Sequence, residues 1–314
     1  MTRRTILMYH RVADDPSDAY GLCVDPVRFE AQLGVLAELA DVVALGDLVA
    51  TSRASGPIGP TRRARKHGRP QIALTFDDGY ADNLEHALPA LEAHDAPATI
   101  YVSTGALGRP RGFWWDRLAL LLAGRAEVEL ELVLAGSPLR VSLHGARAAT
   151  DALVALHSRL RLLDADVVDA ALVTIASQLG TDVPEPRSAR TLRHEELEKL
   201  AASPLVTVGA HTVDHRLLAG LPPGTQEAQM RRSVLELEKL LGRPVRDFAY
   251  PYGDPSSFDR DSLAAARRCG FATACTTLGG RVTRLNDRLQ LPRWMVRDWD
   301  ADTFRSRLVA WGAA

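Results

Sequence analysis

The sequence has few cysteines and no long apolar run. Its cysteines, Cys23, Cys269 and Cys275, are odd in number and lack the paired spacing of zinc-binding motifs, so we expect buried thiols and no disulfide framework. No segment approaches the roughly 18 consecutive apolar residues of a membrane helix. The first residues, 1–5, lead into a strand-like segment and not into an apolar signal region. We therefore expect a cytoplasmic protein with no integral membrane segment.

The sequence also has no excess of either charge. A net charge of -1 at pH 7 gives no electrostatic reason to expect nucleic acid as a partner. The basic segment 61–69 is a local exception, because its arginines and lysine could attract the phosphate of a nucleotide-linked or lipid-linked sugar. A solvated loop explains the same segment, given the glycine and proline around it.

An acidic pair follows a predicted buried strand. Residues 71–76 are apolar and β-prone, and they are followed by Asp77, Asp78 and Gly79. The pair is expected where a strand ends in a loop, which is where α/β proteins build their sites. Adjacent strand-end residues point in different directions, so one carboxylate can bind a metal while the other acts as a general base. Helix capping by both acids is the alternative for this run alone.

Two histidines follow a second predicted strand. His211 and His215 are four residues apart, a spacing that one helical turn would place on one side of the chain. Two imidazoles and one carboxylate leave a coordination position open for water. Zinc bound in this way lowers the pKa of its water from 15.7 to about 7 and polarises a carbonyl group. Ordinary surface or core histidines are the alternative interpretation.

Three motifs in this order resemble those of the polysaccharide deacetylases, which form carbohydrate esterase family 4 and are also called the NodB-homology domain. The resemblance extends from about Ile6 to Val296. It implies an α/β fold with a distorted (β/α) barrel, and metal-dependent removal of acetyl groups from N-acetylated amino sugars. The sugar could belong to a polymer, an oligosaccharide or a lipid-linked or nucleotide-linked precursor, and the lack of an apolar signal region favours a precursor. The motifs are Leu-Thr-Phe-Asp-Asp-Gly-Tyr at 74–80, Gly-Ala-His-Thr-Val-Asp-His at 209–215 and Phe-Ala-Tyr-Pro-Tyr-Gly at 248–253.

The resemblance also assigns roles to single residues. It implies that Asp77 is the catalytic base, that Asp78 binds a metal beside His211 and His215, and that the backbone N–H of Tyr252 stabilises the oxyanion. No separate organic cofactor is expected. Zn²⁺ is the first expectation for the metal, with Co²⁺, Ni²⁺, Mn²⁺ and Fe²⁺ as alternatives, because this donor set accepts several divalent ions.

The sequence departs from the family pattern at two positions, so other residues have to supply the functions of the missing ones. The motif arginine two positions before Pro-Tyr is Ala249 here, and the late Leu-x-His motif is replaced by Leu-Pro-Arg-Trp at 291–294. The N-terminal strand ends in Met-Tyr-His, as in family branches that look circularly permuted. We therefore predict that His10 is the general acid, because histidine titrates near neutral pH. A hydrogen-bonded strand histidine is the alternative.

Arg293 is predicted to replace the missing arginine. It follows the strand-like residues 289–291, which we expect to close the barrel, and arginine suits bidentate contact with a carboxylate. A structural arginine is the alternative.

Predicted strands and helices alternate along the chain, which favours an α/β fold and not segregated layers of strands and helices. We expect residues 1–314 to form a single domain of this class. The first helix is expected to begin at Asp25-Pro26, through side-chain capping and a proline in its first turn. The further strands are predicted at 71–76, 98–103, 206–210, 247–251 and 271–276, and the further helices at 81–94, 192–202, 225–241, 259–269 and 301–311.

Residues 107–190 are interpreted as an inserted α+β cap within this domain, because a minimal barrel does not need them. The insertion combines an alternating, strand-like segment at 128–143 with a helical region at 151–179. Trp114 and Trp115 could stack on sugar rings or contact a lipid carrier. Core packing is the alternative for both, since tryptophans before an apolar helix commonly anchor it.

Other functions stay open on the sequence alone. The same fold and metal site would serve a deformylase or an amidase acting on a non-polymeric substrate such as a cyclic imide. A non-catalytic sugar-binding relative is favoured by Ala249 and the missing Leu-x-His motif, and opposed by the intact Asp77.

Overall fold

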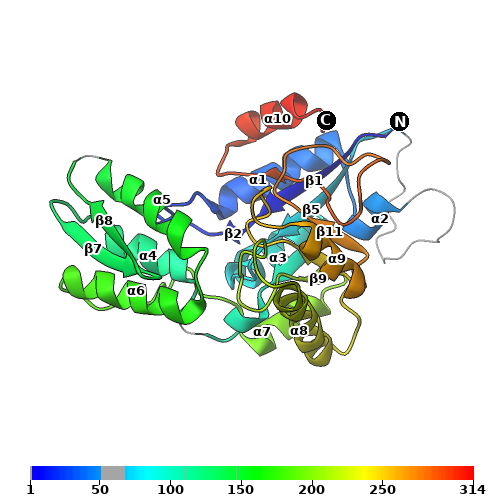
Figure 1. The fold of residues 1–314 in the computed structure, drawn as a ribbon. Coiled ribbons are helices and arrows are strands. Elements are labelled where there is room, and N and C mark those ends of the chain that lie inside the picture. Colours follow the sequence, from blue (N-terminus) through cyan, green and yellow to red (C-terminus); the bar gives the residue numbers. More distant parts are fainter. Residues whose placement is uncertain (1, 51–67, 110, 146) are drawn as a thin grey trace. The chain divides into compact units, whose positions relative to one another are not determined.

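The protein forms two compact units (Figure 1). The structure, a computed structural model, describes residues 2–50, 68–109, 111–145 and 147–314, so most of the basic segment 61–69 lies outside the described residues. The interpretation of residues 107–190 as an insertion stays a prediction. Unit 1 comprises Met1–Asp14, Gly21–Leu107 and Leu192–Ala314, and unit 2 comprises Asp15–Tyr20 and Gly108–Thr191.

In the described part of unit 1, eight strands form one parallel sheet in the order β11-β10-β9-β6-β5-β1-β12, with β4 paired to β5 outside this path. A separate parallel pair joins β2 (Arg11–Val12) and β3 (Cys23–Val24). The strands of the large sheet are β1 (Arg4–Tyr9), β4 (Asp41–Val42), β5 (Gln71–Phe76), β6 (Ala98–Val102), β9 (Val206–Ala210), β10 (Asp247–Ala249), β11 (Thr273–Cys275) and β12 (Trp294–Met295).

The segment that contains Leu291 brings the two ends of this sheet together. Leu291 forms a parallel bridge with Cys275 of β11, and β12, a few residues later, pairs with Leu7 and Met8 of β1. The curved parallel sheet with its helices is a distorted (β/α) barrel, so the fold class predicted from the motifs is confirmed.

Side-chain alternation along the strands separates the barrel interior from the outer face. Ile6, Ala73, Tyr101, Ala249 and Cys275 come from five different strands and belong to one buried cluster. Residues on strands that are not neighbours can share a cluster only if the sheet curves around them. The alternate residues of the same strands pack against the helices in the main core.

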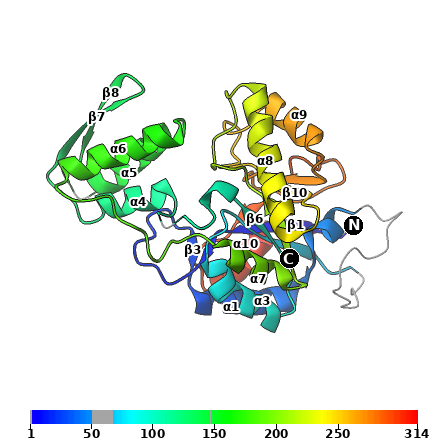
Figure 2. The same cartoon turned by 90° about the horizontal axis from the view of Figure 1, so that it is seen from below.

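The helices of unit 1 surround this sheet (Figures 1 and 2). As predicted, α1 begins at Pro26, with the Asp25 side chain accepting hydrogen bonds from the N–H groups of Val27 and Arg28. The other predicted boundaries agree with the structure to within a few residues at most ends. The helices are α1 (Pro26–Leu39), α2 (Leu45–Val49), α3 (Leu88–Ala93), α7 (His194–Ala202), α8 (Pro223–Leu241), α9 (Arg260–Arg268) and α10 (Ala301–Ala310), with a short 3₁₀ turn at Thr104–Ala106.

The helix predicted over 81–94 is not a continuous α-helix. It begins as a π-helical turn, η1 (Asn83–Ala87), in which the N–H of Leu88 bonds the carbonyl of Asn83, and it continues as α3. Pro89 explains the change, because it has no N–H to donate and its ring clashes with the carbonyl four residues earlier. π-turns of this kind are frequent at functional sites.

Unit 2 has its own hydrophobic core. Its antiparallel hairpin of β7 (Glu129–Leu134) and β8 (Ser137–Ser142) alternates buried and exposed residues along β7. Trp115 is buried and stacks on Phe113 at a centroid distance of 4.3 Å, which favours core packing for this residue. The helices of unit 2 are α4 (Trp114–Leu122), α5 (Ala148–Leu160) and α6 (Ala165–Gln178).

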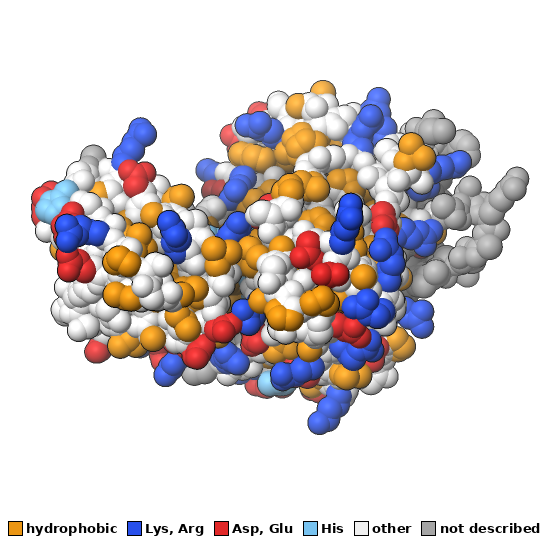
Figure 3. All heavy atoms as spheres, in the orientation of Figure 1, with side chains coloured by type: hydrophobic (Ala, Val, Ile, Leu, Met, Phe, Trp, Pro, Cys, Tyr) orange, Lys and Arg blue, Asp and Glu red, His pale blue; other side chains and the backbone are white. Residues whose placement is uncertain are grey.

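No helix in the described ranges is both long and apolar enough to cross a membrane. On the face drawn in Figure 3, side chains of both charge signs are interspersed and neither sign gathers in one large area. This distribution agrees with the near-zero net charge.

Candidate active site

Asp77 and Asp78 follow β5 at the carboxyl end of the sheet, and both are buried. The parallel register pairs Tyr9 with Phe76, and the N–H of Asp77 continues this pairing by donating to the carbonyl of Tyr9. Asp78 has a φ of 76° and Gly79 a φ of 82°, so the chain turns sharply after Asp77. Positive φ is uncommon outside glycine, although aspartate adopts it more readily than most residues, and here it aims the second carboxylate away from the first.

Asp78 faces two imidazoles. Its Oδ1 atom lies 3.4 Å from Nε2 of His211 and 3.2 Å from Nε2 of His215. The three side chains are buried, and their donor atoms all lie within 4.8 Å of one another. Zinc bonds of about 2.1 Å in a tetrahedral arrangement place two donor atoms about 3.4 Å apart. The two distances from Asp78 to the imidazoles therefore fit a single divalent ion.

The hydrogen bond on the far side of His211 fixes its tautomer. Nδ1 lies 2.7 Å from the backbone carbonyl oxygen of Ala249, so this nitrogen carries the proton and Nε2 presents its lone pair to Asp78. Burial raises the pKa of Asp78, but the two imidazoles beside it, those of His211 and His215, outweigh burial and hold that pKa below its ordinary value. Such a carboxylate is ionised and ready to bind a cation.

The histidine motif is a loop, so the prediction that one helical turn brings the two imidazoles together is wrong. Thr212 and His215 have φ values of 64° and 51°, and such left-handed residues interrupt a helix. The loop is instead hydrogen-bonded to the segment after β6. Ser103 Oγ donates to the carbonyl of His211 at 2.9 Å, and the N–H of Gly105 donates to the carbonyl of Val213 at 2.8 Å.

A glutamine on α8 adds a second support to this loop. Gln229 Oε1 accepts hydrogen bonds from the N–H groups of Val213 and Asp214, both at 3.1 Å, and its Nε2 donates to Asp214 Oδ2 at 2.9 Å. Positive φ angles in the loop are maintained because these contacts determine its backbone from both sides.

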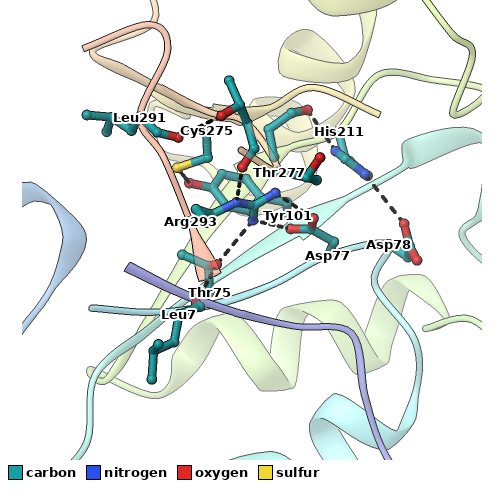
Figure 4. Close-up of polar contacts among 12 residues, drawn as sticks. Leu7, Thr75, Asp77, Asp78, Tyr101, His211, Cys275, Thr277, Leu291 and Arg293 are labelled. Atoms are coloured by element: carbon teal, nitrogen blue, oxygen red, sulfur yellow. Dashed lines mark hydrogen bonds and ion pairs between the residues drawn. The ribbon is translucent and has the colours of Figure 1, made fainter. Parts of the chain in front are cut away.

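Arg293 binds the other carboxylate of the pair. Its Nη1 and Nη2 atoms donate to the two oxygens of Asp77, each at 2.7 Å, in a bidentate ion pair (Figure 4). The guanidinium is fully buried, lies 5.6 Å from the centroid of the Tyr101 ring, and donates through Nε to the carbonyl of Thr276. Ala249, at the position of the family arginine, lies in the same interior cluster as Tyr101.

This ion pair determines the charge of Asp77. Burial raises the pKa of the carboxyl group, but the charge and the hydrogen bonds of Arg293 outweigh burial and hold that pKa below its ordinary value. For Arg293, burial lowers the pKa, and the carboxylate of Asp77 more than reverses this effect. Asp77 is therefore an anion at neutral pH, as a general base has to be.

His10 follows β1 and is partly buried. Met8 pairs with Thr75 in the parallel register, so two residues further His10 is level with Asp77 and on the same face of the sheet. Burial lowers the pKa of His10, Asp78 and Asp77 raise it, Arg293 and His211 lower it again, and the balance lies below the ordinary histidine value. The structure thus brings the N-terminal histidine to the two acids.

Tyr252 lies beside the second imidazole. Its ring meets that of His215 edge to face at a centroid distance of 4.9 Å, and its backbone has a φ of 61°. Its carbonyl accepts a hydrogen bond from Thr277 Oγ1 at 2.8 Å. The next residue, Gly253, passes so close to the chain that an added Cβ would lie 2.7 Å from the backbone nitrogen of Thr277. The Pro-Tyr-Gly turn therefore has a constrained backbone.

Thr75 also belongs to the polar contacts around Asp77 and Arg293, and it was not predicted from the sequence. Thr75 Oγ1 accepts from Arg293 Nη1 at 3.1 Å and donates to the carbonyl of Leu7 at 2.8 Å (Figure 4). The signal was available, since Thr75 lies two residues before Asp77 and strand alternation places both on one face.

The fold and this site define a class of protein. The chain matches the polysaccharide deacetylase family over residues 64–131 and 156–274, more than half of its length, and so it belongs to this family of hydrolases. The family predicted from the three motifs is confirmed.

Comparisons with individual proteins agree with this family. YxkH of Bacillus subtilis (strain 168), whose name includes the words polysaccharide deacetylase, is 29% identical over 90 residues. This match spans 29% of the chain and 31% of the relative, so it covers under a third of either protein.

Two solved structures share the fold over nearly their whole length. The Streptococcus pyogenes deacetylase PplD in complex with acetate has a TM-score of 0.60 at 19% identity, with 97% of each chain covered. IcaB from Ammonifex degensii has a TM-score of 0.59 at 20% identity, with 100% of this chain and 98% of that chain covered.

Proposed function

We propose that the protein hydrolyses the N-acetyl group of an N-acetylated amino sugar with the help of a divalent metal ion. One observation carries the proposal. Two adjacent buried carboxylates have separate partners, since Asp77 is paired with Arg293 and Asp78 with two imidazoles. This separation gives one acid to the metal and leaves the other for proton transfer, which is the division of work that metal-assisted hydrolysis needs.

Asp78, His211 and His215 would hold the ion, for which Zn²⁺ is the first expectation because its usual donors are imidazole nitrogen and carboxylate oxygen. When bound, a divalent ion of this kind polarises the acetamide carbonyl group and makes a water molecule more acidic. The hydrogen bond from His211 to Ala249 keeps the first imidazole oriented for this task.

Asp77 would accept the proton of the attacking water. The bidentate contact with Arg293 fixes the position of the carboxylate and keeps it ionised. A general base contributes only if it is held within hydrogen-bonding reach of the proton that it removes. Arg293 thus would take the place of the family arginine that is missing at Ala249.

His10 would donate a proton to the departing amine. Its pKa lies below the ordinary histidine value, so its protonated form gives up the proton readily. The backbone N–H of Tyr252 would stabilise the oxyanion, since fixed donors act most strongly where charge develops. Acetate and a free amino sugar are the products.

An N-acetylated sugar is the proposed substrate, either in a polymer or in a lipid-linked or nucleotide-linked precursor. Support comes from family membership and from PplD of Streptococcus pyogenes, a deacetylase whose structure contains acetate. The proposed reaction releases the same molecule.

The proposal is tested by measuring acetate and formate release from N-acetylglucosamine oligomers, nucleotide sugars and lipid-linked sugars in the presence of Zn²⁺ or Co²⁺. Asp77→Asn is expected to lower turnover by at least about 10²-fold, the contribution typical of one acid-base group. The matched control is Asp302→Asn, which changes an exposed aspartate on α10 and should leave turnover unchanged.

The outcomes separate the alternatives. Acetate release that Asp77→Asn abolishes supports the deacetylase, and formate release would identify a deformylase. A variant that keeps more than about a tenth of wild-type turnover would refute the role of Asp77. Metal binding without any release would favour a non-catalytic sugar-binding relative.

A further inference from the structure

His10 is the single residue between two strands. β1 ends at Tyr9 and β2 begins at Arg11, and the carbonyl of His10 accepts a hydrogen bond from Asn83 Nδ2 at 2.9 Å. The His10 Nδ1 atom is buried and has no hydrogen-bond partner within the described ranges. Since this side of the ring has no such contact, the position of the imidazole depends on where its backbone is held.

Asp82, the residue before Asn83, holds Arg11 and Val12, the two residues after His10. Asp82 Oδ2 accepts from Arg11 Nε at 2.9 Å, and Asp82 Oδ1 accepts from the N–H of Val12 at 3.2 Å and from Asn83 Nδ2 at 3.1 Å. Arg11, Asp82 and Asn83 are all buried. We call the side chains of Asp82 and Asn83, with their contacts to residues 10–12, the Asp-Asn clamp.

Stability alone is a weak reason for this arrangement. The desolvation of a buried Arg–Asp pair can exceed the attraction between the charges, and apolar side chains of similar volume often stabilise a fold as well or better. Asn83 also has a buried Oδ1 atom without a partner among the described residues, which adds a further cost. What the polar contacts supply is a defined backbone position at His10, because hydrogen bonds are directional.

The clamp belongs to the same short segment as the proposed base. Asp82 and Asn83 lie at the start of η1, a few residues after Asp77, and the N–H of Asp77 donates to the carbonyl of Tyr9 at 3.1 Å. One segment therefore contacts the chain on both sides of His10. Any shift of this segment moves the base and the acid together, which preserves the distance between them.

We propose that Asp82 and Asn83 are positioning residues that place His10 for proton donation to the leaving amine. The proposal rests on the proposed function, in which His10 is the general acid. It predicts that loss of the clamp impairs only reactions whose leaving group has to be protonated.

The test compares two substrates of wild type, His10→Ala and Asn83→Ala. One is the amide from which wild type releases acetate in the panel above, and the other is 4-nitrophenyl acetate, whose leaving group departs as a stable anion. Ester hydrolysis is taken as the rate that a metal chelator abolishes, so that hydrolysis outside the proposed metal site is excluded. The matched control is Asn286→Ala, because the side chain of Asn286 closes a surface turn with Thr283.

We expect His10→Ala to lower kcat on the amide by about 10²-fold and Asn83→Ala by about 10-fold, with little change in KM. Ester hydrolysis should stay within about twofold of wild type in both variants, which also shows that they fold and bind metal. The double variant should be no slower than His10→Ala, because residues that act through one group are not additive. Asn83→Leu, which is similar in size and cannot donate to the His10 carbonyl, should repeat the selective loss.

Three results would overturn the inference at different levels. The first result is that His10→Ala slows the amide selectively, while Asn83→Ala slows the amide and the ester equally or slows neither. This result would refute the positioning role alone. A non-selective His10→Ala would refute the general acid and the clamp with it. A wild type inactive on every amide of the panel would refute the proposed function and therefore this inference.

Discussion

At the residue scale, the site depends on one buried arginine. Arg293 is fully buried, and its charge is compensated by Asp77, with two further oxygens accepting from its N–H groups. A buried charge is tolerated only when it is paired and hydrogen-bonded. The same contacts orient the Asp77 carboxylate, so substitutions of Arg293 should affect catalysis before they affect the metal.

Arg293→Lys is expected to keep the fold and the metal but to lower kcat by at least about 10-fold. Lysine carries the charge as a point and cannot make the bidentate contact with Asp77. The measurement is turnover together with metal content, and Arg284→Lys is the matched control because Arg284 is exposed. Wild-type turnover in Arg293→Lys would show that the planar contact is unimportant.

The titration of Asp82 should make the free energy of unfolding depend on pH. Burial raises its pKa from 3.8 to about 6, although Arg11 opposes the shift. A folded-state pKa above the unfolded one means that folding takes up a proton, so the related stability is present below pH 3.8 and lost as the pH rises through 6. The free energy of unfolding of wild type relative to Asp82→Asn should fall by roughly 2 kcal/mol between pH 4 and 7, since a full pH unit between the two pKa values is worth about 1.4 kcal/mol.

Urea unfolding of both proteins across this pH range checks the expectation. A difference that grows as the pH rises would mean that the attraction of Arg11 exceeds the effect of burial.

At the element scale, β9 has to approach β6 closely before the metal loop begins. A Cβ on Gly209 would lie 2.5 and 2.6 Å from two ring atoms of Tyr101, and Tyr101 itself lies in the barrel interior under Arg293. The glycine of the second motif is therefore required by packing, and it determines where the following His211 is placed.

Gly209→Ala is expected to destabilise the protein by roughly 1 to 3 kcal/mol, the usual cost of overpacking a core. Gly224→Ala is the matched control, because Gly224 lies on α8 and an added Cβ there would point into open space among the described residues. That control should be neutral or slightly stabilising, since alanine is the better helix former. Thermal unfolding measures both, and equal melting temperatures would contradict the close contact with Tyr101.

At the scale of the whole molecule, the proposed metal would connect segments that are far apart in the sequence. Its ligands follow β5 and β9, which are separated in the sheet by β6. An ion that binds the folded state alone stabilises it by about 2.7 kcal/mol at 100 times its dissociation constant.

Removal of metal with a chelator should therefore abolish turnover and lower the melting temperature, and Zn²⁺ or Co²⁺ should restore both. His215→Ala should lose the metal-dependent change in melting temperature. His194→Ala, at the exposed start of α7, should retain it. An unchanged melting temperature in wild type with and without Zn²⁺ would argue against a metal bound by this site.

The sequence by itself determined the family and the α/β class, because the chemistry-bearing residues stand in three short runs whose order and local pattern are readable without coordinates. The acids after β5 and the histidines after β9 could be named for the same reason. Strand alternation also indicated that adjacent acids face different partners, and the structure shows Asp77 and Asp78 doing so.

Only the tertiary structure decided which distant groups meet these residues. Asp77 and Arg293 are 216 positions apart, and Asn83 lies 73 positions from the carbonyl of His10 that it bonds. Local patterns carry no information about such pairs, because sheet closure and strand register bring them together. The left-handed loop that presents His211 and His215 was likewise beyond local reasoning, since contacts with Ser103, Gly105 and Gln229 override the helical spacing of the two histidines.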